Sequence, residues 1–373
     1  MVVLGTRPEA IKLCPVVQEF QSRAEIDPIV CSTGQHREML EHVLSYFQIK
    51  PDLELAVMRP GQTLAGLTSR LLSSLDESIQ SHRPTCLVVQ GDTTTVMVAS
   101  ILGFYHKLPI VHVEAGLRTG DLMAPWPEEF NRRVAGLVAT LHAAPTQKSA
   151  DALLAEGTRP EKVRVTGNTV IDALLQTAER ERKSEDRWRE KYSMVSDQPL
   201  VLITGHRRES FGQGLQDTCD AIATFANAHP EVTMIYPVHL NPNVQGPVHE
   251  LLGSLPNVHL LPPASYDEFV WLMDRASIVL TDSGGVQEEA PSLNCEVLVT
   301  REKTERPEAV EAGLAKLVGT DRDLILSSLE ESLAKKKLEV NSRSITDLGQ
   351  INNPYGDGKA SKRIAEWMIE SLV

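Results

Sequence analysis

The sequence predicts an α/β fold with two Rossmann-like, doubly wound domains that face a cleft. Short apolar runs typical of strands alternate with helical patterns along most of the 373 residues. Some runs, such as the one beginning at Cys86, are apolar throughout, as in parallel strands that are covered on both faces. The chain is also long enough for two ordinary domains.

The expected strands form two series, separated by the polar segment Gln176–Asp197. The first series is Val2–Leu4, Pro28–Thr33, Thr85–Gln90, Ile110–Val113, Leu141–Ala144 and Val163–Val165. The second is Leu200–Thr204, Thr233–Tyr236, Val258–Leu261, Ile278–Thr281 and Glu296–Val299. Helices are expected between strands, for example over Thr93–Phe104 and Ser265–Asp274. The polar segment, rich in Glu, Arg and Lys, is expected to be an exposed helix leading into the second domain.

Composition excludes several classes of partner and location. The net charge of −13 argues against nucleic acid and anionic membranes, which attract a broad basic face. No apolar run approaches the roughly 20 residues that span a bilayer, and the opening residues do not resemble a signal peptide. The five scattered cysteines suggest buried thiols in a reducing compartment, so we expect a cytoplasmic protein.

Two cations follow the first expected strand. Thr6 suits a helix cap and Pro8 the first helical turn. Arg7 and Lys12 lie close to that helix start, where anions are favoured. The structural alternative is a surface cap with solvated charges.

Three carboxylates lie at or just after strand ends in the first half of the chain. Asp92 precedes a Thr run and also suits an ordinary helix start. Glu114 follows an apolar strand, with Arg118 available as a partner. Glu128 and the neighbouring Glu129 would each pair with an arginine four residues later. Singly these residues favour structural roles, but together they indicate acid–base chemistry.

The second half carries features typical of phosphate binding. His206 precedes two arginines and a Gly-bearing loop. The run Ser283-Gly284-Gly285 leads from a strand into a helix, so open backbone N–H groups would cradle a diphosphate. Glu289, further along that helix, would accept hydrogen bonds from a ribose. The alternative is a tight turn that needs glycine for backbone reasons.

Several familiar signatures are absent from the sequence. No G-x-G-x-x-G opens a helix after a strand, no Walker loop occurs, and no H-E-x-x-H or comparable metal cluster is present. We therefore expect neither a nicotinamide cofactor nor a metal.

Nine motifs occur in an order typical of one family: G-T-R-P-E-A-I-K, Q-H-R-E-M-L, G-D-T-T-T, H-V-E-A-G-L-R-T, P-E-E-x-N-R, G-N-T-V-I-D-A-L, H-R-R-E-S, D-S-G-G-x-Q-E-E-A and T-E-R-P-E. The chain resembles the bacterial non-hydrolysing UDP-N-acetylglucosamine 2-epimerases over almost its whole length. The resemblance implies a glycosyltransferase B-like fold and a homodimer. It also implies conversion of UDP-N-acetylglucosamine to UDP-N-acetylmannosamine for cell-surface polysaccharides. The N-terminal domain would span 1–168, with a C-terminal helix within 355–373 packing back on it, and the UDP-binding domain would span 169–354.

The resemblance also implies roles for individual residues. The catalytic residues would be Asp92, Glu114, Glu128 and His206. The substrate-binding residues would be Arg7, Lys12, Phe269, Ser283, Gly284, Gly285, Glu289 and Arg306. A second UDP-N-acetylglucosamine would bind as an allosteric activator near Gln35, Arg207 and His239. Two positions depart from that activator site, because Glu38 and Gly61 replace a Gln and an Arg found in some members.

The chemistry of the sugar fits this interpretation. The hydrogen on carbon 2 is barely acidic, so expulsion of UDP from carbon 1 would make it removable and leave 2-acetamidoglucal. UDP would then add back after protonation from the opposite face. The alternatives are a glycosyltransferase of the same fold, a hydrolysing epimerase that releases N-acetylmannosamine and UDP, and a non-catalytic UDP-sugar sensor.

Overall fold

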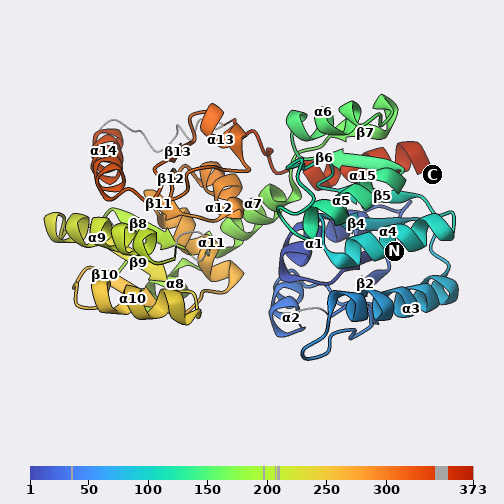
Figure 1. The fold of residues 1–373 in the computed structure, drawn as a ribbon, viewed down its shortest axis with the longest axis horizontal. Helices are drawn as coiled ribbons and strands as arrows, with labels where there is room; N and C mark the ends of the chain where they lie inside the picture. Colours follow the sequence, from blue (N-terminus) through green and yellow to red (C-terminus); the bar gives the residue numbers. More distant parts are fainter. Residues whose placement is uncertain (35–36, 196–197, 206, 208–210, 341–351, 373) are drawn as a thin grey trace. The chain divides into compact units, whose positions relative to one another are not determined.

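The structure, a computed structural model, describes residues 1–34, 37–195, 198–205, 207, 211–340 and 352–372. Its contacts divide the chain into two compact units, Met1–Ala173 with Tyr355–Val373 (unit 1) and Leu174–Pro354 (unit 2). Each unit contains one parallel sheet with helices packed around it (Figure 1). The expectation of two Rossmann-like sheets is confirmed.

Unit 1 is built on a seven-stranded parallel sheet of order β3-β2-β1-β4-β5-β6-β7. Its strands are β1 (Val2–Leu4), β2 (Val30–Ser32), β3 (Leu53–Glu54), β4 (Leu87–Gln90), β5 (Ile110–Val113), β6 (Leu141–Ala144) and β7 (Val163–Val165). Its helices are α1 (Arg7–Gln21), α2 (Arg37–Tyr46), α3 (Leu64–His82), α4 (Thr94–Tyr105), α5 (Glu128–Val138), α6 (Gln147–Ala155) and α15 (Ala360–Leu372), and α7 (Thr169–Arg182) begins in it. The central strands β1, β4 and β5 are buried along their whole length, which explains their apolar sequences.

Unit 2 repeats this plan with six parallel strands of order β10-β9-β8-β11-β12-β13. They are β8 (Leu200–Thr204), β9 (Thr233–Pro237), β10 (Val258–Leu261), β11 (Ile278–Thr281), β12 (Glu296–Val299) and β13 (Ala315–Leu317). The helices are α8 (Glu185–Lys191), α9 (Gln213–Ala228), α10 (Pro242–Leu252), α11 (Tyr266–Arg275), α12 (Gly284–Glu289), α13 (Pro307–Glu311) and α14 (Arg322–Val340). The short strands β3 and β13 were not expected from the sequence.

Strand order reverses once in each sheet, between β1 and β4 in unit 1 and between β8 and β11 in unit 2. At such a switch point the loops after the two strands diverge and leave a crevice for ligands. Arg7 and Asp92 follow β1 and β4, whereas Arg207 and Ser283 follow β8 and β11. The predicted binding segments therefore lie at the two switch points.

The polar segment after residue 175 differs from the single exposed helix that was expected. It contains the end of α7 and the separate helix α8. Trp188 and Tyr192 from this segment are buried, and both stack against Trp271 of α11. The two aromatic side chains are four residues apart, so they share one helix face, while the charged residues around them remain in solvent.

Gly116, in the turn after β5, is required by both its conformation and its packing. Its φ is +93°, and a Cβ there would lie 2.2 Å from the Ser149 carbonyl oxygen. We predict that Gly116→Ala lowers the free energy of unfolding by about 2 to 5 kcal/mol, the sum of left-handed strain and overpacking. Urea denaturation measures this change.

Gly157→Ala is the matched control. Its φ is +89°, but no atom lies within 4 Å of an added Cβ. This variant should therefore lose only about 1 to 2 kcal/mol for the left-handed backbone. Equal losses in the two variants would contradict the packing argument.

Candidate functional site

The start of α1 is organised by a buried carboxylate, that of Glu9. Thr6 caps the helix as expected, and Glu9 completes a capping box with it. Glu9 Oε2 accepts hydrogen bonds from the backbone N–H groups of Gly5 (3.0 Å) and Thr6 (2.7 Å) and from the Thr6 hydroxyl (2.8 Å). Its Oε1 accepts one from the Thr93 hydroxyl at 2.8 Å. Burial raises the pKa of Glu9, and these hydrogen bonds oppose that rise. Glu9 thus joins the loops after β1 and β4, a role that the sequence analysis missed.

Glu114 lies at the end of β5 and is nearly buried. Lys12 Nζ lies 2.5 and 2.7 Å from its two carboxylate oxygens, Gln90 donates to Oε2, and Asn168 donates to Oε1 at 3.2 Å. The expected pairing with Arg118 is wrong, because Arg118 forms a two-pronged ion pair with Glu156. Glu114 also has a φ of +60°, which is unusual for a residue other than glycine. Backbone strain of this kind is often found at functional sites.

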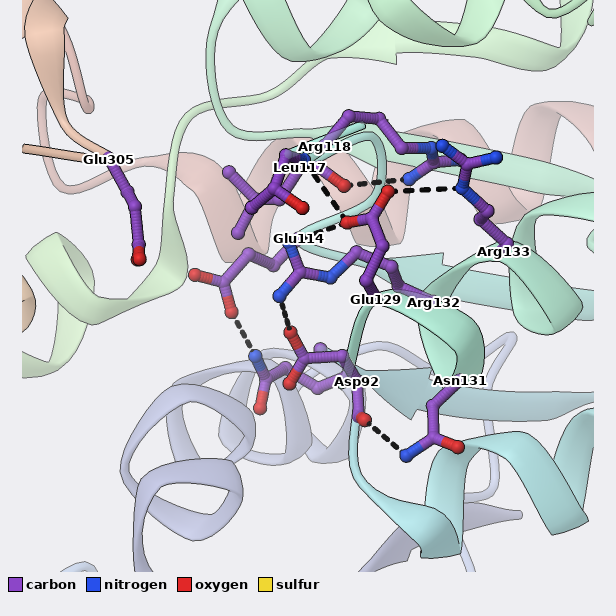
Figure 2. A network of polar contacts seen from close by, with 12 residues as sticks. Asp92, Glu114, Leu117, Arg118, Glu129, Asn131, Arg132, Arg133 and Glu305 are labelled. Carbon is purple, nitrogen blue, oxygen red and sulfur yellow. Dashed lines mark hydrogen bonds and ion pairs between the residues drawn. The ribbon is translucent and has the colours of Figure 1, made fainter. Parts of the chain in front are cut away.

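Asp92 is held by a different cation. Its carboxylate lies 2.5 Å from Arg132 Nη2, and its carbonyl accepts a hydrogen bond from Asn131 at 2.9 Å (Figure 2). Asp92 is not the helix cap, because Thr93 caps α4. Burial raises the pKa of Asp92, Arg132 opposes the rise, and the charge of Glu114 adds to it. The carboxyl group is therefore shifted towards its protonated form.

The two adjacent acids at the start of α5 differ from expectation. Arg132 pairs with Asp92 and, at 3.5 Å, with Glu129, so the proposed pair with Glu128 does not form. Glu129 is fully buried and also pairs with Arg133 at 3.0 Å, as expected (Figure 2). Glu128 is half-buried and has no hydrogen-bond or ion-pair partner among the described residues.

Asp92 and Glu114 are thus neighbouring carboxyl groups with separate counterions. Arg132 contacts one and Lys12 the other, and the charge of Glu114 influences the pKa of Asp92. Groups whose environments differ in this way can hold different protonation states at one pH. The arrangement can therefore supply both an acid and a base.

A histidine supports the loop that carries Asp92. The buried His112 ring donates from Nε2 to the Gly91 carbonyl oxygen, 2.8 Å away. Its neighbour on β6 is His142, also buried. Burial lowers the pKa of His112 to about 4 and that of His142 to about 3, so both rings are neutral near pH 7.

The switch point of unit 2 carries the Ser283–Gly285 run. Ser283 precedes α12, and Gly284 and Gly285 form its first turn with ordinary negative φ values. A Cβ at either glycine would meet neighbouring atoms only at 3.8 to 3.9 Å, an ordinary contact distance. Neither the backbone nor the packing therefore requires glycine, which weakens the tight-turn alternative. The absence of side chains leaves the N–H groups of this turn accessible.

Other predicted binding residues are placed around α11 and α12. Phe269 lies half-buried on α11, and Glu289 is buried at the end of α12. Arg306 is paired with Glu288, and its backbone N–H donates to Thr304 Oγ1 at 3.0 Å. The structure thus holds Arg306 against the helix that carries Glu289.

The predicted activator residues are only partly described. Gln35 lies outside the described residues, as does His206, which was predicted to be a catalytic residue. Arg207 donates its backbone N–H to Asp282 Oδ2 at 2.8 Å, and His239 is exposed after β9. Asp282 was missed by the sequence analysis, although it lies directly before Ser283.

Neither a metal centre nor a membrane-spanning helix is formed by the described residues. No group of three or more His, Cys, Asp or Glu side chains there is arranged to hold a metal ion. None of the helices formed by those residues has both the length and the apolar character to cross a bilayer.

Comparisons with known proteins agree over almost the whole chain. The model of the family described as UDP-N-acetylglucosamine 2-epimerase matches residues 18–369. The Escherichia coli K12 protein named UDP-N-acetylglucosamine 2-epimerase is 47% identical over 371 residues, covering 98% of this chain and 97% of that protein.

Solved structures show the same similarity. The Neisseria meningitidis UDP-GlcNAc 2-epimerase, bound to UDP-GlcNAc, has a TM-score of 0.89 and 45% identity and covers 99% of each chain. The Methanocaldococcus jannaschii UDP-GlcNAc 2-epimerase, in complex with UDP-GlcNAc and UDP, has a TM-score of 0.80 and 30% identity, again covering 99% of each chain. The glycosyltransferase B-like fold expected from the sequence is thereby confirmed.

The buried histidines give a testable dependence of stability on pH. Because the folded-state pKa of His142 is about 3 and the unfolded value is about 6.5, the unfolded chain binds the proton first as pH falls. The stability associated with neutral His142 is therefore complete above about pH 6.5 and is progressively lost below it. We predict that the unfolding free energy of His142→Leu falls by about 3 kcal/mol less than that of the parent when the pH is lowered from about 6.5 to about 4. Denaturation curves at several pH values measure it.

The exposed His249 provides the control for this measurement. His249→Leu should leave the pH dependence unchanged. A His142→Leu variant whose stability falls with pH as steeply as that of the parent would show that burial of this ring is not responsible.

Proposed function

This chain belongs to the UDP-N-acetylglucosamine 2-epimerase family, and we propose that it interconverts UDP-N-acetylglucosamine and UDP-N-acetylmannosamine without hydrolysing either. The observation that carries the proposal is the pair Asp92 and Glu114, which follow the adjacent strands β4 and β5 beside the switch point of unit 1, each with its own cation. The similar Neisseria meningitidis enzyme bound to UDP-GlcNAc supports the substrate.

The proposed reaction is an elimination followed by an addition. A base removes the proton from carbon 2, the bond between carbon 1 and the phosphate oxygen breaks, and UDP leaves with the electron pair. The product is 2-acetamidoglucal. A proton then returns to carbon 2 from the opposite face, and the UDP oxygen attacks carbon 1 to restore the sugar–phosphate bond. Proton transfer at two faces requires more than one acid or base.

Unit 1 supplies the groups for proton transfer. Asp92 and Glu114 have different partners and are candidates for acid and base, and Glu128 is the third proposed catalytic carboxylate. Lys12 and Arg7 are proposed to face the substrate from α1. Lys12 has a second effect, because its charge favours an ionised Glu114.

Unit 2 is proposed to bind UDP. The Ser283–Gly285 turn would bind the diphosphate, with the backbone N–H groups of Gly284 and Gly285 as donors, because the Ser283 N–H already donates to Thr281 Oγ1 at 3.0 Å. These donors would stabilise the negative charge that the diphosphate gains when the bond to carbon 1 breaks. His206 is proposed to assist there. Glu289 would accept hydrogen bonds from the ribose, and Phe269 and Arg306 would contact the nucleotide. Arg207 and His239, with Gln35, are proposed for a second, activating UDP-N-acetylglucosamine.

The cellular location is proposed from the state of the cysteines, and the cellular role from the proposed product. All five cysteines are free, and four of them are buried, which suits a reducing compartment and supports a cytoplasmic location. The product would supply precursors of cell-surface polysaccharides.

Proton NMR of the purified protein with UDP-N-acetylglucosamine in deuterated water tests the reaction. We expect the manno product with deuterium at carbon 2. Free N-acetylmannosamine with UDP would indicate a hydrolysing epimerase. Unchanged substrate that reacts only after an acceptor is added would indicate a glycosyltransferase, and binding without any reaction would indicate a sensor.

We predict that Asp92→Asn and Glu114→Gln lower turnover by about 10² to 10⁴-fold, the usual contribution of a positioned acid or base. Affinity for UDP should change little, because the residues proposed to bind UDP lie in unit 2. Initial rates and calorimetric titration with UDP measure the two effects. Glu156→Gln, at a half-exposed carboxylate paired with Arg118, is the control and should retain turnover. Retention of full turnover by both active-site variants would exclude these residues from the mechanism.

A homodimer is proposed to form through α4 and α5, which pack against each other. Phe104 and Tyr105 end α4 with 62% and 70% of their surface exposed, and Phe130 and Leu137 are 49% and 86% exposed on α5. Residues 130 and 137 are two helical turns apart and share a face. Apolar surface of this kind marks an interface, and a second copy of the chain is the proposed occupant.

We predict that Leu137→Glu yields a monomer, because a buried charge at the interface has no partner. Size-exclusion chromatography with light scattering measures the mass. Leu324→Glu, at an exposed leucine of α14, is the control and should remain dimeric. A monomeric parent protein, or a dimeric Leu137→Glu variant, would exclude this interface.

A further inference from the structure

The motif Gly167-Asn168-Thr169-Val170-Ile171-Asp172 has no role in the proposed function. We propose that Asn168 is a positioning residue for Glu114 and that the C-terminal return of the chain holds Asn168 in place. This inference rests on the proposed function of Glu114.

The Asn168 side chain can present only its NH₂ group to Glu114. Nδ2 donates to Glu114 Oε1 at 3.2 Å, while Oδ1 accepts a hydrogen bond from the Val170 backbone N–H at 3.2 Å. Because Oδ1 is occupied by a donor, the amide orientation is determined. Asn168 is 2% exposed, so these contacts are shielded from water.

The backbone of Asn168 is held by the segment before α15. Its N–H donates to the Tyr355 carbonyl oxygen at 2.6 Å. Gly167, with a φ of +89°, allows a close approach, because a Cβ there would lie 3.3 Å from Gly356 Cα. Two residues far apart in the sequence are thus linked by a backbone hydrogen bond next to Glu114.

The other end of the motif, Asp172, binds the same C-terminal segment, which runs from Tyr355 into α15. Asp172 accepts hydrogen bonds from the backbone N–H groups of Ala360 (3.1 Å) and Ser361 (2.7 Å), which begin α15. Arg363 also donates to the Thr166 carbonyl oxygen at 3.0 Å. The motif is therefore attached to the C-terminal segment at both ends, with Asn168 between the attachments.

A neutral donor at this position has a specific effect on the carboxylate. Lys12 already provides the cation for Glu114, so an amide fixes the orientation of Oε1 without adding charge. An aspartate at 168 would keep the acceptor for Val170 but place a second carboxylate against Glu114. Like charges at this distance disfavour ionisation.

The test compares Asn168→Asp and Asn168→Ala in the full chain, with kcat and KM measured across pH. Both variants should lower kcat by about 10-fold or more, because small misplacements of a catalytic group are costly. In Asn168→Asp, the limb of the kcat profile that reports this carboxyl group should also move up by about one pH unit. Affinity for UDP should remain within about two-fold of the parent in both.

Asp172→Asn is the matched control for lost stability, since it weakens the attachment of α15 but leaves Asn168 its hydrogen bonds to Glu114, Val170 and Tyr355. It should lower the melting temperature and leave the pH profile in place. If Asn168→Asp and Asn168→Ala also leave the profile in place and lose activity only in proportion to their melting temperatures, the positioning role is overturned. This comparison can be made only if the parent protein is active. A parent that gives no epimer would overturn the proposed function itself.

Discussion

A carboxylate held at the end of β5 places the strongest constraint on unit 1. Removing a carboxylate from water costs several kcal/mol unless a counterion and hydrogen bonds replace its hydration. For Glu114 these come from Lys12 on α1, Gln90 at the end of β4 and Asn168 before α7. The charge is stabilised only when three separate segments are correctly placed. The strand order β1-β4-β5 brings Lys12 and Gln90 next to Glu114, and Asn168 reaches it from the segment after β7.

Unit 2 uses the same topology for a different purpose. At its switch point the structure presents a turn without side chains, at Gly284 and Gly285, in place of a cluster of acids. Asp282 accepts the backbone N–H of Arg207, so the loops after β8 and β11 are joined by one hydrogen bond. One sheet therefore carries neighbouring carboxyl groups with separate cations, and the other carries a turn in which two glycines leave the backbone uncovered. This division follows from side chains placed on equivalent strand ends of one architecture.

The sequence predicts the fold well because buried parallel strands are continuously apolar, a signal that β3 and β13 lack since they are short and partly exposed. Pairings between distant residues were not predictable. Lys12 is 102 residues from Glu114, whereas the nearer candidate Arg118 binds elsewhere. The burial of Trp188 was not predictable, because charged residues surround it in the sequence. The capping residue of α4 was also not predictable, because Asp and Thr both suit an N-cap. In the structure Thr93 caps the helix, and the preceding Asp92 does not.

The contact between Glu9 and Thr93 has a consequence for how this protein can change over time. One oxygen of Glu9 binds Gly5 and Thr6, just before α1, and the other binds the Thr93 hydroxyl, from a different part of the chain. Replacing the threonine by an apolar residue would leave a buried acceptor without its donor, and replacing the glutamate would leave two hydroxyls and two backbone N–H groups without their acceptor. Each single step passes through a less stable intermediate. Proteins that descend from this chain should therefore keep both residues or exchange both together. Positions 9 and 93, although distant in the sequence, are expected to co-vary.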